Sequence, residues 1–190
     1  MPKKIAVLIS HGFEDEEYLQ CVHAFSIAGH QCFTLGLDAA SICHGLHTKT
    51  KLSIDQSLAN IRLDAFDALL ILGGQSPLHL AQKTTTRTFI RQCIDAKKII
   101  FSLSSAPLLL LSADVLHERL ISTQRPLAAV LQKAGAYYYD AEVVNDHNEI
   151  ISCRGIDDLE AFIPECLEAL DGDAFYPLFK ETTMYQLYAH

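Results

Sequence analysis

The chain has 190 residues, of which 49% are hydrophobic and 20% are charged, and its formal net charge is −8 at pH 7. This size and composition fit one ordinary soluble globular domain with a single sizeable core. The acidic balance leaves no basic stripe for a nucleic acid, and no apolar run approaches the length of a membrane span.

Cysteine and histidine usage predicts a cytoplasmic protein without a metal or other cofactor. The six cysteines are spread along the chain and form no Cys-x-x-Cys pair. The apolar run at residues 5–10 is too short for the core of a secretory signal. We therefore expect free thiols and a reducing compartment. The nine histidines form no cluster with metal-ligand spacing, so we expect no structural zinc.

The N-terminal third predicts two strands around a helix. Residues 5–10 are continuously apolar, which suits a strand buried on both faces of a parallel sheet. Acidic residues then open a helix over residues 14–28, because carboxylates are favoured in a first helical turn. Residues 31–37 form the second predicted strand. The weak alternation of residues 38–55 predicts a short β-hairpin or edge ribbon.

The middle of the chain predicts a third and a fourth parallel strand. Residues 66–72 read FDALLIL and end at Gly73-Gly74, and one helix is predicted over residues 77–96. Residues 99–111 then read IIFSLSSAPLLLL, an apolar strand that turns sharply into a helix at Ser104 and Ser105. In α/β proteins such a corner lies at the carboxyl ends of the strands, where ligands and nucleophiles are found.

The C-terminal third completes the predicted α/β pattern. Its elements are a strand at 121–122, a helix at 126–134, a hairpin of strands 141–145 and 149–153 turning at 146–148, and a helix at 157–170. Alternating strands and helices predict one α/β domain over residues 1–172, a three-layer sandwich with a mostly parallel sheet and helices on both faces. The aromatic extension 173–190 is expected to dock on this body or on a partner chain.

Four blocks of the chain, in order, resemble the ThiJ/PfpI superfamily, relatives of the class I glutamine amidotransferases, the PfpI-type intracellular protease and the parkinsonism-associated deglycase. The blocks are the first strand with GFEDEE at 12–17, FDALLILGG at 66–74, FSLSSAPLLLLSADVL at 101–116, and residues 135–159. The resemblance covers about residues 5–171. It implies a flavodoxin-like sheet and a homodimer.

The resemblance also locates a candidate site. Members of this superfamily usually carry Cys-His-Gly-Pro at the strand-to-helix turn, with the cysteine as nucleophile. Here the cysteine corresponds to Ser104, the histidine to Ser105 and the glycine to Ala106, and Pro107 is kept. An acid that serves the neighbouring subunit's site in the protease-like branch corresponds to Leu78.

Two further parts of the family site are kept. Glu17 corresponds to the glutamate that contacts the elbow, and Gly73-Gly74 corresponds to the turn lining the oxyanion pocket. Residues 41–45, SICHG, nearly spell the nucleophile motif. They precede no proline and open no leucine-rich helix, so we interpret the match as coincidence.

Three functions are open. We favour a protein that has lost the cysteine-dependent chemistry and keeps a small-molecule-binding or regulatory role, because nucleophile, histidine and acid are lost together. A chaperone-like or scaffold protein is the second. The third is an enzyme for a small carbonyl or acyl substrate, with Ser104 as nucleophile or Glu17 as general base and the backbone N–H groups of Gly74 and Ser105 as oxyanion donors.

The serine corner also has a purely structural interpretation. Ser104 and Ser105 are small residues that fit a tight turn, and their hydroxyls could cap the following helix. An attacking serine needs a positioned base. Glu17 or one of the loop histidines His11, His44 and His79 could supply it.

Overall fold

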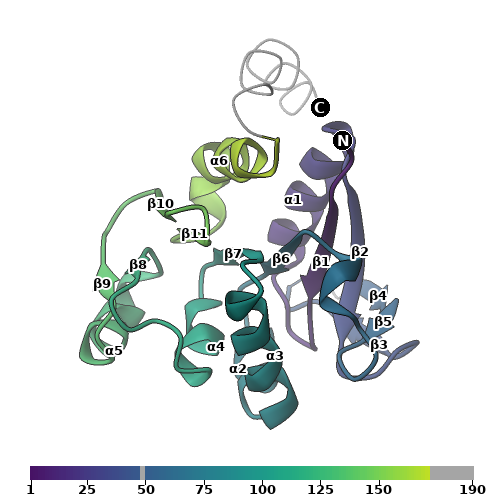
Figure 1. The fold of residues 1–190 in the computed structure, drawn as a ribbon, viewed down its shortest axis with the longest axis horizontal. Helices are drawn as coiled ribbons and strands as arrows, with labels where there is room; N and C mark the ends of the chain where they lie inside the picture. Colours follow the sequence, from purple (N-terminus) through teal and green to yellow (C-terminus); the bar gives the residue numbers. More distant parts are fainter. Residues whose placement is uncertain (48–49, 172–190) are drawn as a thin grey trace.

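A computed structural model describes residues 1–47 and 50–171 of the chain (Figure 1). Within these residues the predicted α/β order is present from the first strand to the last helix. The predicted docking of residues 173–190 lies outside the described residues. No helix in the described part is long and apolar enough to cross a membrane.

A seven-stranded sheet forms the centre of the fold, in the order β10-β11-β7-β6-β1-β2-β5. β10 runs antiparallel to β11, and every other pair in this sheet is parallel. This confirms the mostly parallel sheet. The strands are β1 (Lys4–Leu8), β2 (Gln31–Gly36), β5 (Gln56–Ser57), β6 (Ala68–Ile71), β7 (Ile99–Leu103), β10 (Val143–Asp146) and β11 (Ile150–Cys153).

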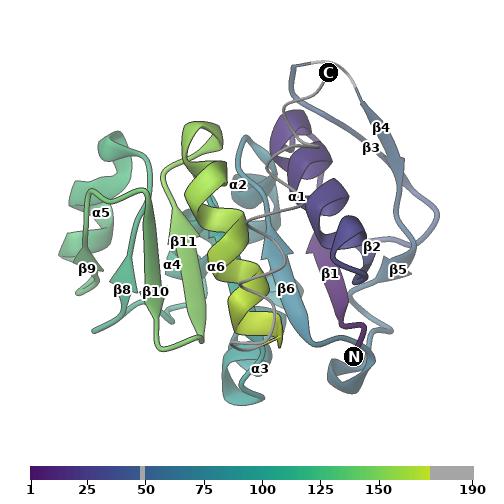
Figure 2. The same cartoon turned by 90° about the horizontal axis from the view of Figure 1, so that it is seen from above.

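Helices cover both faces of this sheet (Figure 2). α1 (Asp15–Ile27) and α6 (Leu159–Asp171) lie on one face. α2 (Ser76–Ala81), α3 (Thr84–Asp95) and α4 (Pro107–Ser112) lie on the other. α5 (Ala128–Lys133) flanks the β10 edge beside a small parallel pair, β8 (Leu120–Ile121) and β9 (Tyr137–Tyr138). The three-layer α/β sandwich is therefore confirmed.

The core has two halves because the side chains of a strand alternate between the two faces. In β1, Ile5 and Val7 pack on the α1/α6 side, and Ala6 and Leu8 pack on the other. All four are fully buried. Burying a side chain of the size of Ile5, Val7 or Leu8 contributes about 1.5–3 kcal/mol, so the apolar runs of the sequence fix the central strands.

β7 is anchored by aromatic contacts. Phe101 stacks on Phe25 of α1 at 5.8 Å between ring centroids and meets Phe162 of α6 edge-on at 6.4 Å. Such pairs contribute about 0.5–1.5 kcal/mol each beyond their buried area. They hold the strand whose end carries Ser104.

Both predicted hairpins are present. β3 (Ile42–His44) and β4 (Lys51–Ser53) pair antiparallel and form the ribbon after β2. β10 and β11 turn through His147 and Asn148, whose φ angles are 56° and 58°. Two consecutive left-handed residues make the tight hairpin turn that matches strand twist.

Three predicted helices differ in detail from the structure. The single helix predicted over 77–96 is wrong: α2 and α3 are separate, and Lys83 between them is extended, with φ −95° and ψ 124°. The Arg87 guanidinium donates to the Ala81 carbonyl at 2.8 Å and to Thr84 Oγ1 at 3.0 Å, which satisfies the end of α2. The helices predicted at 126–134 and 157–170 each begin with a 3₁₀ turn, Arg125–Leu127 and Ile156–Asp158.

Three short elements were not predicted. They are β5, β9 and a 3₁₀ turn at Leu63–Ala65. Each spans two or three residues, which is too short for a periodic pattern to show.

Candidate functional site

Ser104 occupies a left-handed turn at the end of β7. Its φ is 56°, a region that costs a non-glycine residue about 1–2 kcal/mol. Both backbone groups are held: the Ser104 N–H donates to the Cys153 carbonyl at 3.2 Å, and Thr123 Oγ1 donates to the Ser104 carbonyl at 2.6 Å. Contacts from β11 and from the segment after β8 thus maintain the strained elbow.

Gly73 and Gly74 lie directly against this elbow. A Cβ at Gly73 would overlap Ser104 Cβ, and a Cβ at Gly74 would overlap the Gly12 carbonyl oxygen. Gly74 also has a φ of 82°, where glycine is strongly favoured. The structure therefore brings the predicted Gly73-Gly74 turn and Ser104 together, and both positions need glycine.

Glu17 reaches the elbow from the first turn of α1. Its side chain is 1% exposed, its Oε2 accepts the Gly73 N–H at 2.7 Å, and it is hydrogen-bonded to Ser104. Burial raises the pKa of Glu17 from 4.5 to about 7, against the lowering effect of these two hydrogen bonds. A group with this pKa gains and loses a proton near neutral pH.

Gln124 is a site residue that sequence reasoning missed. Its Nε2 donates to Ser104 Oγ at 2.9 Å. Because a hydroxyl has a single proton, Ser104 is left to donate that proton to the ionised Glu17. The result is a directed chain from Gln124 through Ser104 to Glu17. Gln124 lies in an irregular segment after β8, where no pattern marked it.

Ser105 has a structural hydrogen bond. Its Oγ donates to the Gly74 carbonyl at 2.8 Å, and the residue is 9% exposed. Neither serine caps α4: the N-cap residue is Ala106, and it receives no side-chain hydrogen bond. The capping interpretation was therefore wrong, because the strained elbow aims Ser104 at Glu17 and Ser105 at the glycine turn.

Two backbone donors remain at the elbow. The N–H groups of Gly74 and Ser105 make no hydrogen bond to any residue that the structure describes. Gly74 belongs to the glycine turn that lies against the elbow, and Ser105 directly follows Ser104 in the chain. Unpaired N–H groups in such a turn form a concavity suited to a carbonyl oxygen or an anion.

The three candidate histidines gather with one another, although only His11 lies in a loop, since His44 ends β3 and His79 lies on α2. The His11 and His44 rings stack at 5.6 Å, the His44 N–H donates to His11 Nδ1 at 3.3 Å, and His79 Nδ1 is 3.1 Å from the His11 carbonyl oxygen. None of them has a hydrogen bond to Ser104 within residues 1–47 and 50–171. Glu17 is thus the base in contact with the hydroxyl.

No activated thiol lies at the elbow. Cys153 is the cysteine beside Ser104, and burial raises the pKa of its thiol well above the usual value. Cys43 of the SICHG segment lies on β3, is 6% exposed, and also has a pKa raised by burial. Thiols become reactive when their pKa is lowered. In the described part of the chain no group of side chains could hold a metal ion.

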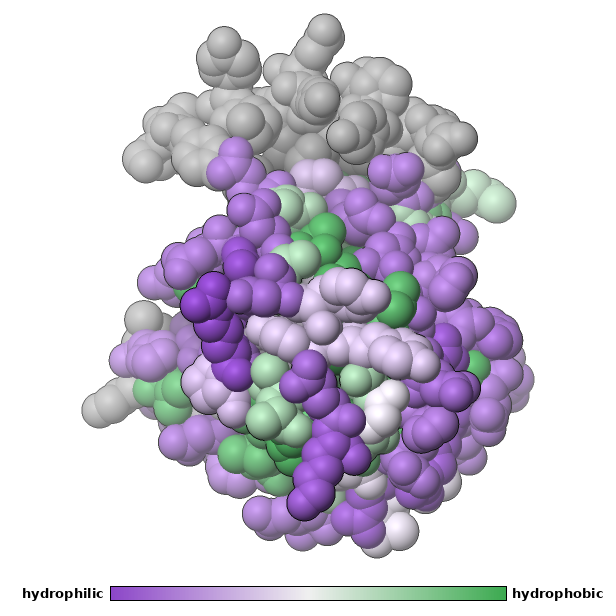
Figure 3. All heavy atoms as spheres, turned by 90° about the vertical axis from the view of Figure 1, so that its left-hand side faces the viewer, coloured by the Kyte–Doolittle hydropathy of each residue, from purple (hydrophilic) through white to green (hydrophobic). Residues whose placement is uncertain are grey.

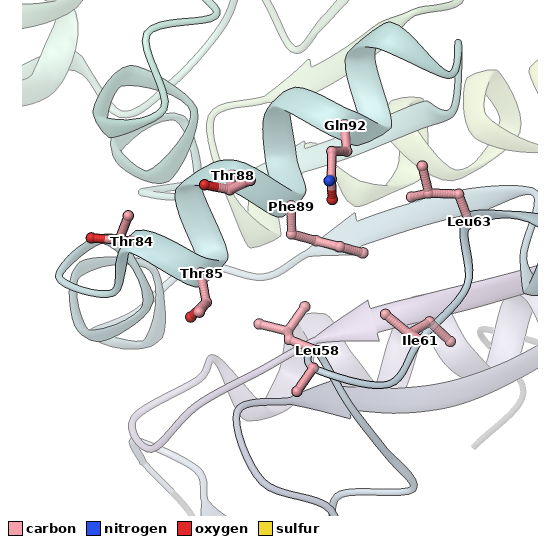
Figure 4. Close-up of a pocket in the computed structure, with 9 residues that line it drawn as sticks. Leu58, Ile61, Leu63, Thr84, Thr85, Thr88, Phe89 and Gln92 are labelled. Carbon is pink, nitrogen blue, oxygen red and sulfur yellow. The ribbon is translucent and has the colours of Figure 1, made fainter.

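A separate apolar recess of about 300 Å³ lies between α3 and the segment after β5 (Figure 4). Leu58, Ile61 and Phe89 point into it, and the α3 threonines lie along its side (Figure 4). None of the predicted site residues lines it. The elbow is therefore the candidate site that carries polar chemistry.

A parallel α/β sheet with a strained serine at its strand-to-helix corner defines a nucleophile-elbow protein. The chain belongs to the DJ-1/PfpI family, whose model matches residues 3–169.

Curated relatives match over nearly the same length. "Protein/nucleic acid deglycase 2" of Escherichia coli is 38% identical over 170 residues, covering 90% of this chain and 99% of the relative. "Putative cysteine protease YraA" of Bacillus subtilis is 39% identical over 170 residues, with the same coverage.

Solved structures agree with the fold. Drosophila melanogaster DJ-1beta matches with a TM-score of 0.84 at 20% identity, over 94% of this chain and 95% of that one. A DJ-1 superfamily protein from Salmonella typhimurium matches with a TM-score of 0.83 at 26% identity, over 96% and 98%.

Proposed function

We propose that this protein binds a small carbonyl compound at the elbow and lacks the cysteine-dependent hydrolase, glyoxalase and deglycase chemistry. The observation that carries the proposal is Ser104: a hydroxyl stands at the strained turn where the family resemblance places a thiol. The ligand carbonyl lies between this hydroxyl and the N–H groups of Gly74 and Ser105.

The chemistry of the two side chains supports this proposal. A free thiol with a pKa of about 8.5 is already a few per cent thiolate at pH 7, whereas a serine hydroxyl is not ionised. The residue corresponding to the family's histidine is Ser105, whose hydroxyl is bound to the Gly74 carbonyl. One relative is named a putative cysteine protease, and this elbow has Ser104 where the family resemblance places the cysteine.

Turnover of glyoxal by the wild type, Ser104→Ala and Ser104→Cys tests the loss of activity. We expect background rates from the first two and a measurable rate from Ser104→Cys, because the strained turn and its neighbours are kept. A clear drop in turnover from wild type to Ser104→Ala would overturn the proposal.

The hydrogen bond between Ser104 and Glu17 favours a second candidate, a serine-dependent enzyme for a small carbonyl or acyl substrate. Glu17 would take the hydroxyl proton while Ser104 Oγ forms a bond to the carbonyl carbon. The carbonyl π electrons would move to its oxygen, which the two N–H groups would bind. Activity would then rise with pH through about 7 and disappear in both Glu17→Gln and Ser104→Ala.

We further propose a cytoplasmic homodimer built from one domain over residues 1–172, with residues 173–190 as an extension of its interface. The family resemblance supports the dimer, and Leu19, Ile42 and Leu78 are large apolar side chains exposed on the described surface. Light scattering of the full chain and of a form ending at residue 172 tests both parts. Unchanged mass and stability would dismiss the role of the extension. A chaperone-like role would instead appear as suppressed aggregation of an unfolded client.

A further inference from the structure

Two arginines adjoin residues that contact or closely approach the Ser104 hydroxyl. Gln124 donates to Ser104 Oγ, and Arg125 follows it. A Cβ at Gly155 would lie 3.2 Å from the same oxygen, and Arg154 precedes it. The backbones of two different segments thus pass the elbow, and each carries an arginine next to the residue that approaches Ser104.

The two arginines share one carboxylate. Asp140 Oδ2 accepts from Arg125 Nε at 2.7 Å and lies 2.7 Å from Arg125 Nη2. Asp140 Oδ1 accepts from Arg154 Nη1 at 3.1 Å. Arg154 also has its own partner, because its Nε and Nη2 donate to the two oxygens of Asp158 at 2.8 Å each. Asp158 therefore holds the Arg154 guanidinium in place even without the contact to Asp140.

Arg125 is the arginine of this cluster that can exchange its carboxylate partner. Its side chain is 79% exposed, against 32% for Arg154 and 33% for Asp140. Exposed ion pairs contribute little to stability because water screens them. A ligand carboxylate can therefore replace Asp140 on Arg125 at small cost, in the two-pronged geometry that a guanidinium prefers.

Tyr138 supplies an uncommitted donor at the same place. Its hydroxyl oxygen is covered and has no hydrogen-bond partner within the described residues. Burial and then the nearby Asp140 charge raise the pKa of the phenol, so the hydroxyl keeps its proton. A buried donor without an acceptor is costly, and an incoming carboxylate would provide the acceptor.

The outer surface on this side of the molecule suits a polar ligand. The face seen from the α5, β8, β9 and β10 side is mostly hydrophilic, and its hydrophobic areas are small and separated (Figure 3). A hydrophilic approach of this kind favours a polar ligand over an apolar compound.

We propose that the elbow ligand is a small oxo-carboxylate, with its carbonyl at Ser104 and its carboxylate bound by Arg125. This inference rests on the proposed carbonyl-binding function and adds the ligand's charge and the residue that selects it. Asp140 is the competitor that holds Arg125 while the site is empty, and Tyr138 donates to the bound carboxylate.

Calorimetric titration with pyruvate, levulinate and their methyl esters tests the proposal. We expect at least one acid to bind several-fold more tightly than its ester. Arg125→Gln should weaken binding of that acid by a similar factor and leave the ester unchanged. Tyr138→Phe should weaken it a few-fold. Asp140→Asn should tighten it, because the arginines lose their competing anion.

Arg62→Gln is the matched control. Arg62 is about as exposed as Arg125, at 81% against 79%, and its Nη2 lies 2.6 Å from Oδ2 of Asp64, far from Ser104 in the sequence. It should leave every affinity unchanged. A decrease in acid affinity equal to that of Arg125→Gln would show a general charge effect and overturn the proposal.

The outcomes separate the two proposals. Equal binding of acids and esters, lost in Ser104→Ala, would overturn the carboxylate inference and leave the carbonyl-binding function standing. Acid binding that needs Arg125 but not Ser104 would overturn the elbow function and leave an anion site. Absence of binding by all four probes would overturn both.

Discussion

The elbow and the β3 ribbon differ in an instructive way. The ribbon has nearly all of the family's nucleophile motif without the elbow geometry, and the elbow has that geometry without the motif's cysteine and histidine. Residues 41–45 nearly spell the family's nucleophile motif, yet Cys43 lies in a short antiparallel strand and burial raises the pKa of its thiol. The elbow has lost the motif's cysteine and histidine, yet it keeps a φ of 56° at Ser104 and a hydrogen bond to Glu17. The contacts around a side chain therefore matter more for its reactivity than a match to the residue types of the motif.

The largest expected effect is a loss of stability when an added methyl group crowds the elbow. Gly73→Ala places a methyl group where Ser104 Cβ lies, and the strained turn cannot move without losing its two backbone hydrogen bonds. We expect a loss of about 3 kcal/mol in the free energy of unfolding, measured by urea denaturation. Gly29→Ala is the comparison variant for backbone strain without crowding, because Gly29 has a φ of 86° but a Cβ there meets nothing within 4 Å. A loss no greater than that of Gly29→Ala would mean that the elbow is pliable.

Glu17 gives the next largest effect, as a pH dependence. Its pKa rises from 4.5 to about 7 on folding, so the folded state holds a proton that the unfolded state releases. The unfolding free energy should therefore fall between about pH 4.5 and 7, by roughly 3 kcal/mol in total. It should stay low at higher pH.

Glu17→Gln checks this dependence, because the amide does not titrate. Denaturation curves from pH 4.5 to 8 should show a much smaller slope for this variant than for the wild type. Parallel curves for the two proteins would show that Glu17 does not carry the linkage.

The smallest effect is expected in the ribbon. Cys43→Ala removes a buried sulfur and should cost roughly 1–2 kcal/mol of stability while leaving ligand affinity at the elbow unchanged. Binding of the preferred probe to this variant, beside Ser104→Ala, sharpens the comparison. Loss of binding in Cys43→Ala would mean that the ribbon motif belongs to the site.

The sequence by itself determined most strands of the sheet, the alternation of strands and helices along the chain, and the position of the elbow. Continuous apolar runs such as residues 5–10 and 99–103 mark strands buried on both faces, and Pro107 marks the start of α4. These signals are local, because burial and helix geometry act on neighbours along the chain. The helix predicted over 77–96 failed because the interruption at Lys83 depends on Arg87 reaching back to the Ala81 carbonyl.

Only the tertiary structure decided what the elbow can do. Gln124 meets Ser104 across 20 residues, and Gly73 meets Glu17 across 56. Asp140 joins two arginines from different segments. No periodicity or spacing records such contacts, because they arise when distant segments pack at the carboxyl edge of the sheet. Hydrogen-bond direction and burial, which set the proton on Ser104 and the pKa of Glu17, exist only after that packing.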